Sequence, residues 1–181
     1  MGYVQYLIFK IENRKYAIEL AYVNGTEQSY SVSPIPDAPF GIDGLINLRG
    51  KLVPVYSLRQ RFGMDSVITN PAKSAIIAKT SRITMAYEVD EVEFIEQVNE
   101  DDIKEMPHIA GNEDTSFMDK VLHIKNEIIV VVDVNKVLSA DIIETLERML
   151  EERSEAEKKA EEGRRAAELA EKEKELEEKE E

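Results

Sequence analysis

Short runs of alternating apolar and β-branched residues recur along most of this chain, and turn-forming residues separate them. The turn signals return about every 8 to 12 residues from Tyr3 to Val134, which predicts about ten short strands. Strands at this spacing are typical of an all-β barrel or sandwich rather than of alternating strands and helices. We therefore expect a mainly β fold that leaves little room for helix before the C-terminal segment.

Two segments illustrate the pattern. Apolar residues alternate from Tyr3 to Ile11, and a turn then leads into a second strand, which predicts a hairpin. Two apolar runs between Gly41 and Tyr56 meet at Arg49-Gly50-Lys51, where glycine can supply the positive φ of a tight turn. Pro54 lies inside the second run, which predicts an edge strand or a bulge at that point.

The C-terminal segment, residues 141–181, has a different composition. It carries 17 acidic and 9 basic side chains, so that −8 of the chain's net charge of −14 lies there. Ser139 can cap a helix whose apolar face we expect to dock on the barrel. After Leu150 the apolar stripe fades, and the acidic tail is compatible with a solvated helix, with disorder or with a partner-binding, oligomerising helix.

The composition also excludes several classes of protein. A net charge of −14 without a basic cluster argues against a nucleic-acid partner, and the absence of cysteine removes disulfides and thiolate chemistry. The first residues do not resemble a signal peptide, and no apolar run is long enough to span a membrane. We therefore expect a cytoplasmic protein without direct membrane insertion.

Few residues offer catalytic chemistry. His108 and His123 have no metal-ligand spacing around them, and no phosphate-binding loop or nucleophile motif is present, so that we expect no metal and no cofactor. The carboxylates of Asp90, Glu91 and Glu93 could carry acid–base chemistry if one of them were buried. A charged barrel rim is the simpler interpretation, and a small β-barrel ligand-binding protein or hydrolase is the alternative.

The segment from Phe40 to Phe62 resembles the signature hairpin of the CheW family of chemotaxis coupling proteins. It contains the pattern G-x-x-N-L-R-G at 44–50, then V-P-V at 53–55 and L-R at 58–59. The resemblance covers about residues 3 to 145 and leaves out the acidic tail. It implies a non-catalytic adaptor that couples chemoreceptors to the histidine kinase CheA.

The resemblance also implies two five-stranded, SH3-like β-barrel subdomains with a shared core, followed by a C-terminal helix. Residues 1–140 would form the CheW-like domain, and residues 141–181 the helix and tail. The first barrel would span about residues 15–80. The second would span about residues 81–134 and include the N-terminal strand.

The partners that the resemblance implies are the regulatory domain of CheA, the cytoplasmic tips of chemoreceptors and other CheW-like domains in receptor arrays at the inner membrane. The receptor would bind a groove between the barrels, formed by Leu20, Val23, Arg49, Ser74 and Met85, with Ile95 nearby. The kinase would approach Ile42, Gly44 and Leu52. Each of these residues has an alternative: Val23, Met85 and Leu52 could be core residues, and Gly44 could serve only a turn.

Overall fold

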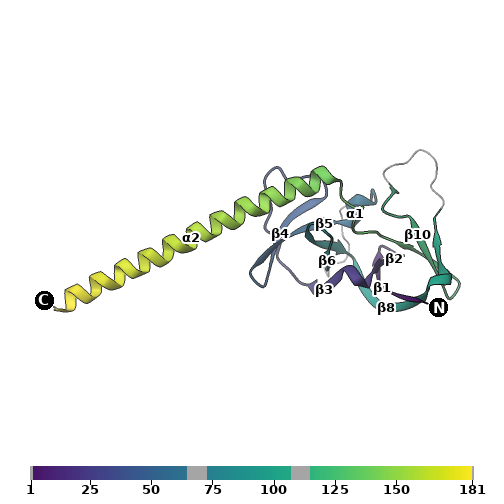
Figure 1. The fold of residues 1–181 in the computed structure, drawn as a ribbon, viewed down its shortest axis with the longest axis horizontal. Helices are drawn as coiled ribbons and strands as arrows, with labels where there is room; N and C mark the ends of the chain where they lie inside the picture. The colour runs from purple at the N-terminus through teal and green to yellow at the C-terminus, as the bar shows by residue number, and fades with distance from the viewer. Residues whose placement is uncertain (1, 65–72, 107–114, 181) are drawn as a thin grey trace. The chain divides into compact units, whose positions relative to one another are not determined.

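The computed structural model describes residues 2–64, 73–106 and 115–180, with side chains as far as residue 172 (Figure 1). The chain divides into two compact units, Met1–Ile143 and Glu144–Glu181. The first unit contains all the described strands, and the second belongs to one long helix.

Five strands form one sheet of the first unit. Its outermost strands are β3 and β4, and the order is β3 (Val23–Gln28), β6 (Ser74–Lys79), β7 (Thr84–Val89), β5 (Lys51–Ser57) and β4 (Ile42–Leu48). All pairs are antiparallel except β5 with β7, whose parallel register runs from Val55↔Ala86 to Ser57↔Glu88. The short helix α1 (Leu58–Arg61) follows β5, and the Ser57 hydroxyl caps it by accepting a hydrogen bond from the Gln60 amide.

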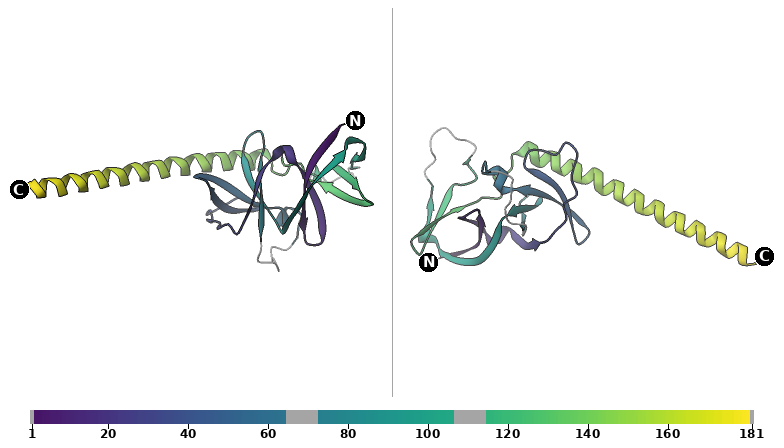
Figure 2. Two further views of the ribbon diagram at one scale, coloured as in Figure 1. Left: turned by 90° about the horizontal axis from the view of Figure 1, so that it is seen from below. Right: turned by 180° about the vertical axis from the view of Figure 1, so that it is seen from behind.

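Six strands form the other sheet, in the order β8 (Glu91–Asn99), β1 (Tyr3–Ile11), β2 (Arg14–Glu19), β11 (Glu127–Val131), β10 (Lys120–Ile124) and β9 (Ile103–Glu105). Two single-turn 3₁₀ helices, η1 (Leu20–Tyr22) and η2 (Glu100–Asp102), link strands of this unit. Figure 2 shows the two groups of strands side by side from two further directions. The sequence-based prediction of a mainly β fold with two small barrel subdomains is confirmed.

Sheet membership differs from the expected ranges at two strands. β2 belongs to the six-stranded sheet, where it pairs with both β1 and β11, although it lies within residues 15–80. β7 belongs to the five-stranded sheet, although it lies within residues 81–134. The six-stranded sheet also has one strand more than expected, β9. The pairing of β2 with β11 spans a long sequence distance and leaves no local turn signal, because it depends on which apolar faces meet. β7 enters the five-stranded sheet through its local hairpin with β6, so that the boundary expected near residue 80 divides this hairpin.

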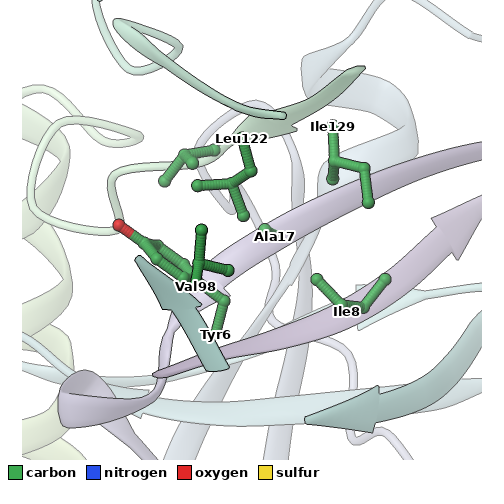
Figure 3. Close-up of a cluster of buried hydrophobic side chains, with 7 residues drawn as sticks. Tyr6, Ile8, Ala17, Val98, Leu122 and Ile129 are labelled. Atoms are coloured by element: carbon green, nitrogen blue, oxygen red, sulfur yellow. The ribbon is translucent and has the colours of Figure 1, made fainter. Parts of the chain in front are cut away.

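The core of the six-stranded sheet gathers side chains from five strands. Figure 3 shows six of them pointing toward one another: Tyr6, Ile8, Ala17, Val98, Leu122 and Ile129. The other face of β1 is also buried, since Leu7 and Phe9 are inaccessible like Tyr6 and Ile8. β1 therefore contributes apolar side chains to two layers of packing, as a central strand does.

Aromatic side chains fill the joint between the two sheets. The rings of Phe9, Tyr16, Phe62 and Phe117 contact one another in sequence, with centroids 5.8, 4.8 and 5.8 Å apart. The buried Tyr87 of β7 donates a hydrogen bond from its hydroxyl to the carbonyl of Val134, which follows β11. Because these contacts join segments distant in sequence, the two barrels share packing and form one unit.

Pro54 belongs to β5, which lies between β4 and β7 in the sheet. At Pro54 itself β5 has a partner strand on one side only, as the predicted edge position requires. β5 pairs with β4 from Lys51 onward but with β7 only from Val55 onward, and Pro54 therefore precedes the ladder to which it could not donate.

The C-terminal helix α2 spans Ala140–Glu180 without interruption. Its start agrees with the sequence-based prediction, because the Ser139 hydroxyl accepts a hydrogen bond from the Ile142 amide at 3.5 Å. Glu161 and Arg165 form an i,i+4 ion pair at 3.0 Å, which supports the helix. The acidic tail is helical rather than disordered over the described residues, and docking of its apolar face on the barrel stays a prediction.

Candidate protein-binding surface

An open groove of about 410 Å³ lies where β1 extends beyond its neighbour β2. β2 pairs with β1 only from Tyr6 onward, whereas β8 pairs with β1 from Tyr3 onward. Residues 3–5 therefore have a strand on one side only, and the chain turns away into η1 on the other side. The groove is lined by Tyr3, Val4, Gln5, Glu19, Leu20 and Ala21.

Three of the predicted receptor-binding residues lie at this groove or in the five-stranded sheet: Leu20, Val23 and Met85. Leu20 lines the groove and is half-buried. Val23, also half-buried, begins β3 and pairs with Ala78, which in turn pairs with Met85 on β7. Met85 is 0% exposed and therefore has the position of a core residue, the alternative considered for it. The structure thus places Leu20, Val23 and Met85 near one another, with only the first two reaching the surface.

Ser74 and Ile95 lie elsewhere. Ser74 is buried at the opposite end of β6, where it pairs with Gln28 and Val89. Ile95 is 53% exposed on β8 and pairs with Leu7 of β1. Ser74 presents almost no surface to a partner, whereas Ile95 presents a large apolar one. The contact role predicted for both residues stays a prediction.

Arg49 occupies the tip of the β4–β5 hairpin. Its φ is 50° and that of Gly50 is 82°, the pair of positive values that a two-residue hairpin turn requires. The Asn47 side chain accepts a hydrogen bond from the Gly50 amide at 2.9 Å and fixes the turn. The Arg49 side chain is exposed and offers a planar donor to a partner carboxylate or carbonyl.

The predicted kinase-binding residues are spread along the same hairpin. Ile42 is buried at a bulge of β4, and Leu52 is half-buried on β5 opposite Asn47. Gly44 has a φ of 148°, and a Cβ at this position would lie 2.3 Å from the carbonyl oxygen of Ser33. Gly44 therefore serves a bulge and a close backbone approach rather than a turn.

Three exposed aromatic residues were not among the sequence-based candidates. Phe40 is 74% exposed two residues before Ile42, Tyr3 is 59% exposed at the groove, and Phe94 is 44% exposed on β8. Phe40 ends a proline-rich stretch, a signal that could have drawn attention to it, because such a loop is extended and displays its side chains. Nothing in the alternating pattern of β1 distinguishes Tyr3 from a core residue.

The carboxylates of the catalytic alternative form structural ion pairs. Asp90 binds the Arg59 guanidinium and also accepts a hydrogen bond from the Glu12 amide at 2.6 Å. Glu93 pairs with Lys10, which lies 3.9 Å from Glu91 as well. These contacts bind β1 to β8 and α1 to both, which explains the acidic residues without a reaction.

A second group of polar side chains is buried in the five-stranded sheet. Glu88 is 5% exposed and accepts hydrogen bonds at 2.9 Å from the Tyr30 hydroxyl and from the Lys73 ammonium. Burial and the nearby Glu88 charge raise the pKa of Asp43, while Lys73 opposes that increase. Burial, followed by Glu88, also raises the pKa of Tyr30. Lys73 and Tyr30 thus supply hydrogen bonds to the buried Glu88 carboxylate. The charged form of Asp43, by contrast, is disfavoured relative to its neutral form.

Within residues 2–64, 73–106 and 115–172, no group of three or more histidine and acidic side chains could hold a metal ion. His123 is exposed on β10, and His108 lies outside the described residues. None of the described helices is long and apolar enough to cross a bilayer.

These observations define a class: a two-barrel, SH3-like binding module with a groove at the corner of its six-stranded sheet and exposed apolar side chains. The family model for the CheW-like domain matches residues 5–141, and the chain therefore belongs to the CheW-like family. This confirms the resemblance inferred from the signature hairpin.

Individual relatives agree with the family assignment. The chemotaxis protein CheW of Rhizobium meliloti is 27% identical over 135 residues, which cover 75% of this chain and 87% of the relative. CheW of Bacillus subtilis is also 27% identical and covers 75% of this chain and 86% of its own length. The crystal structure of the scaffolding protein TtCheW from Thermoanaerobacter tengcongensis superposes with a TM-score of 0.71 at 24% identity, covering 77% of this chain and 95% of that one.

Proposed function

We propose that this chain is a chemotaxis adaptor that couples chemoreceptors to the histidine kinase CheA at receptor arrays, on the cytoplasmic side of the inner membrane. Membership of the CheW-like family and the chemotaxis proteins among its relatives support this proposal. A non-catalytic role agrees with the structural use of Asp90, Glu91 and Glu93. The adaptor would act by binding two partners at once on different surfaces.

The groove at η1 carries the receptor half of the proposal. The groove has a volume of about 410 Å³ and is bordered by the half-buried Leu20 and the exposed ring of Tyr3. A partner side chain could therefore bury apolar surface there. Glu19 supplies one charge at the border of the groove. We expect the cytoplasmic tip of a receptor to bind this groove, with Val23 and Ile95 beside it.

The strands of the β4–β5 hairpin carry the kinase half, whereas Arg49 at the tip keeps its predicted receptor contact. β4 is an outermost strand of its sheet, and the exposed Phe40 lies two residues before its start. Leu52 adds half-buried apolar surface on the neighbouring strand. We expect the regulatory domain of CheA to bind this hairpin, with Phe40 as an anchor that joins Ile42, Gly44 and Leu52. Other CheW-like domains are expected to use the same kind of contact in an array.

Co-purification with a CheA regulatory domain and with a receptor tip tests both halves. Arg49→Glu should weaken receptor binding about tenfold or more without affecting the fold, because it reverses the charge of an exposed donor. Lys51→Glu makes the same charge change two residues away and is the matched control. If the two variants lose receptor affinity equally, Arg49 contributes only its positive charge. That result would contradict a specific contact of Arg49 with the receptor.

The groove has its own test. Ala21→Arg places a long side chain into the groove and should prevent receptor binding while kinase binding persists. Ile128→Arg alters an equally exposed site on β11 and should affect neither partner. Full receptor affinity of the Ala21 variant would exclude the groove as the receptor site, and failure of the wild-type chain to bind either partner would exclude the adaptor function.

A further inference from the structure

The strand β8 forms an open edge of the six-stranded sheet. It pairs with β1 over almost its whole length, from Tyr3↔Asn99 to Lys10↔Glu91. On its other side, no strand of the described chain is bonded to it. An edge strand of nine residues presents unpaired backbone donors and acceptors along that side. The edge is therefore able to accept a further strand.

Two large apolar side chains lie in the middle of this edge. Phe94 is 44% exposed and Ile95 is 53% exposed, and as neighbours on a strand they point to opposite faces of the sheet. A β-bulge interrupts the register between Ile8 and Phe9, near the start of β8, and so protects only one end of the edge. A sheet edge that binds nothing has no need of two exposed apolar side chains. An added strand, by contrast, would place its own side chains over both faces of this edge.

The charge of the edge restricts what can bind there. Residues 90–102 contain seven acidic side chains and no lysine or arginine. Asp90 pairs with Arg59, and Glu91 and Glu93 share Lys10, but Glu96 and the three acids of η2 form no ion pair within the part of the chain that the structure describes. A second copy of β8 would place carboxylates opposite carboxylates, which is destabilising. A basic partner would be attracted instead.

We propose that the open edge of β8 binds an extended segment of a partner protein in which lysine or arginine alternates with apolar residues, as an added β-strand. Backbone hydrogen bonds to β8 would provide part of the affinity. The apolar residues would cover Ile95 on one face of the sheet, and the basic residues would lie on the other face, where Glu96 is, and near η2. This surface lies outside the lining of the η1 groove and shares only Ile95 with the expected receptor contact. Strand addition does not depend on the proposed coupling function.

Fluorescence anisotropy with a labelled peptide of alternating valine and lysine tests the proposal on the full chain. The peptide should bind, and a valine–glutamate peptide should not. An N-methylated valine–lysine peptide keeps the charges but loses backbone donors, and it should bind at least about tenfold more weakly. Equal binding of the methylated peptide would overturn the proposal, because it would reduce the site to charge attraction. Absence of binding by the unmethylated peptide would overturn it as well.

Variants locate the site. Ile95→Ser should lower the affinity roughly fivefold, since part of the buried apolar area is lost, while Ile128→Ser at an exposed site on the interior strand β11 should leave it unchanged. Glu96→Lys should weaken binding more than Glu155→Lys, which makes the same charge change on α2. Hydrogen exchange should slow in residues 91–99 when the peptide is added. Slowing confined to residues 3–5 would instead place the peptide in the η1 groove and would refute the β8 site.

Discussion

The Arg59 guanidinium lies between the Asp90 carboxylate and the turn that joins β1 to β2. Its Nε donates to Asp90 Oδ1 at 3.3 Å, and its Nη1 donates to Glu12 Oε1 at 3.2 Å. Arg59 belongs to α1, next to the five-stranded sheet, whereas Glu12 belongs to the six-stranded one. Arg59 is 9% exposed, so that this bond between the sheets is largely shielded from water.

Replacement of Arg59 should therefore destabilise the strand-bearing unit. Arg59→Met leaves Asp90 as a shielded carboxylate without its counter-ion, and we expect a loss of about 3 kcal/mol in the free energy of unfolding. Urea denaturation measures the loss. The double variant with Asp90→Asn should recover part of it, because the stranded charge is removed. A loss below about 0.5 kcal/mol for Arg59→Met would show that the pair behaves as a solvated surface contact.

Gly44→Ala should destabilise the five-stranded sheet through its backbone. The added methyl group would lie 2.3 Å from the Ser33 carbonyl oxygen, and the φ of 148° is unfavourable for alanine. We expect a cost above about 2 kcal/mol, measured by thermal or urea unfolding. Gly50→Ala is the control, since its φ is 82° but no atom lies within 4 Å. If the two substitutions cost the same, the contact with Ser33 contributes nothing beyond the φ angle.

Asp43→Asn should stabilise the protein at neutral pH. Burial raises the pKa of Asp43 above its ordinary value of 3.8, so the folded state binds this proton more tightly than the unfolded state does. The resulting stability is fully present below pH 3.8 and is lost as the pH rises through the folded-state pKa. Asparagine keeps the acceptor for Gln60 and carries no charge. The gain over wild type should therefore appear at neutral pH and disappear on acidification.

Thermal unfolding of both proteins between about pH 3 and pH 8 checks this pH dependence. Asp37→Asn provides the control, because Asp37 is exposed in the loop before β4. A gain for Asp43→Asn that does not change with pH would contradict the titration of Asp43 as its cause.

Phe117→Ala should be among the costliest single substitutions. The Phe117 ring is 1% exposed, stacks on Phe62 at 5.8 Å and receives the Arg61 guanidinium 4.3 Å from its centre. Loss of the ring leaves a cavity at the joint between the sheets, and we expect a cost of about 3–5 kcal/mol in urea unfolding. Phe40→Ala removes the same ring from an exposed site and should cost less than about 0.5 kcal/mol. Similar costs would disprove the role of this aromatic row in joining the barrels.

The local features of this chain followed from its sequence. Three signals depend only on neighbouring residues. The alternating apolar residues predict the first hairpin, Gly50 predicts the turn after Arg49, and Ser139 predicts the start of α2. All three features lie where these signals place them. The signature hairpin was sufficient for the family, because residues 44–59 retain its spacing.

Tertiary structure alone decided which strands pair and which side chains reach the surface. The sequence did not predict the sheet to which β2 belongs, because its parallel ladder with β11 connects residues more than a hundred positions apart. β7 follows β6 into the five-stranded sheet through a local hairpin, which the expected barrel boundary divided. Met85 and Ile95 look alike as apolar strand residues, yet one is fully buried and the other is half exposed. The difference arises because Met85 lies on a central strand covered by the joint between the barrels, whereas Ile95 lies at an edge. Burial depends on what packs against a strand, and that is set by the whole fold.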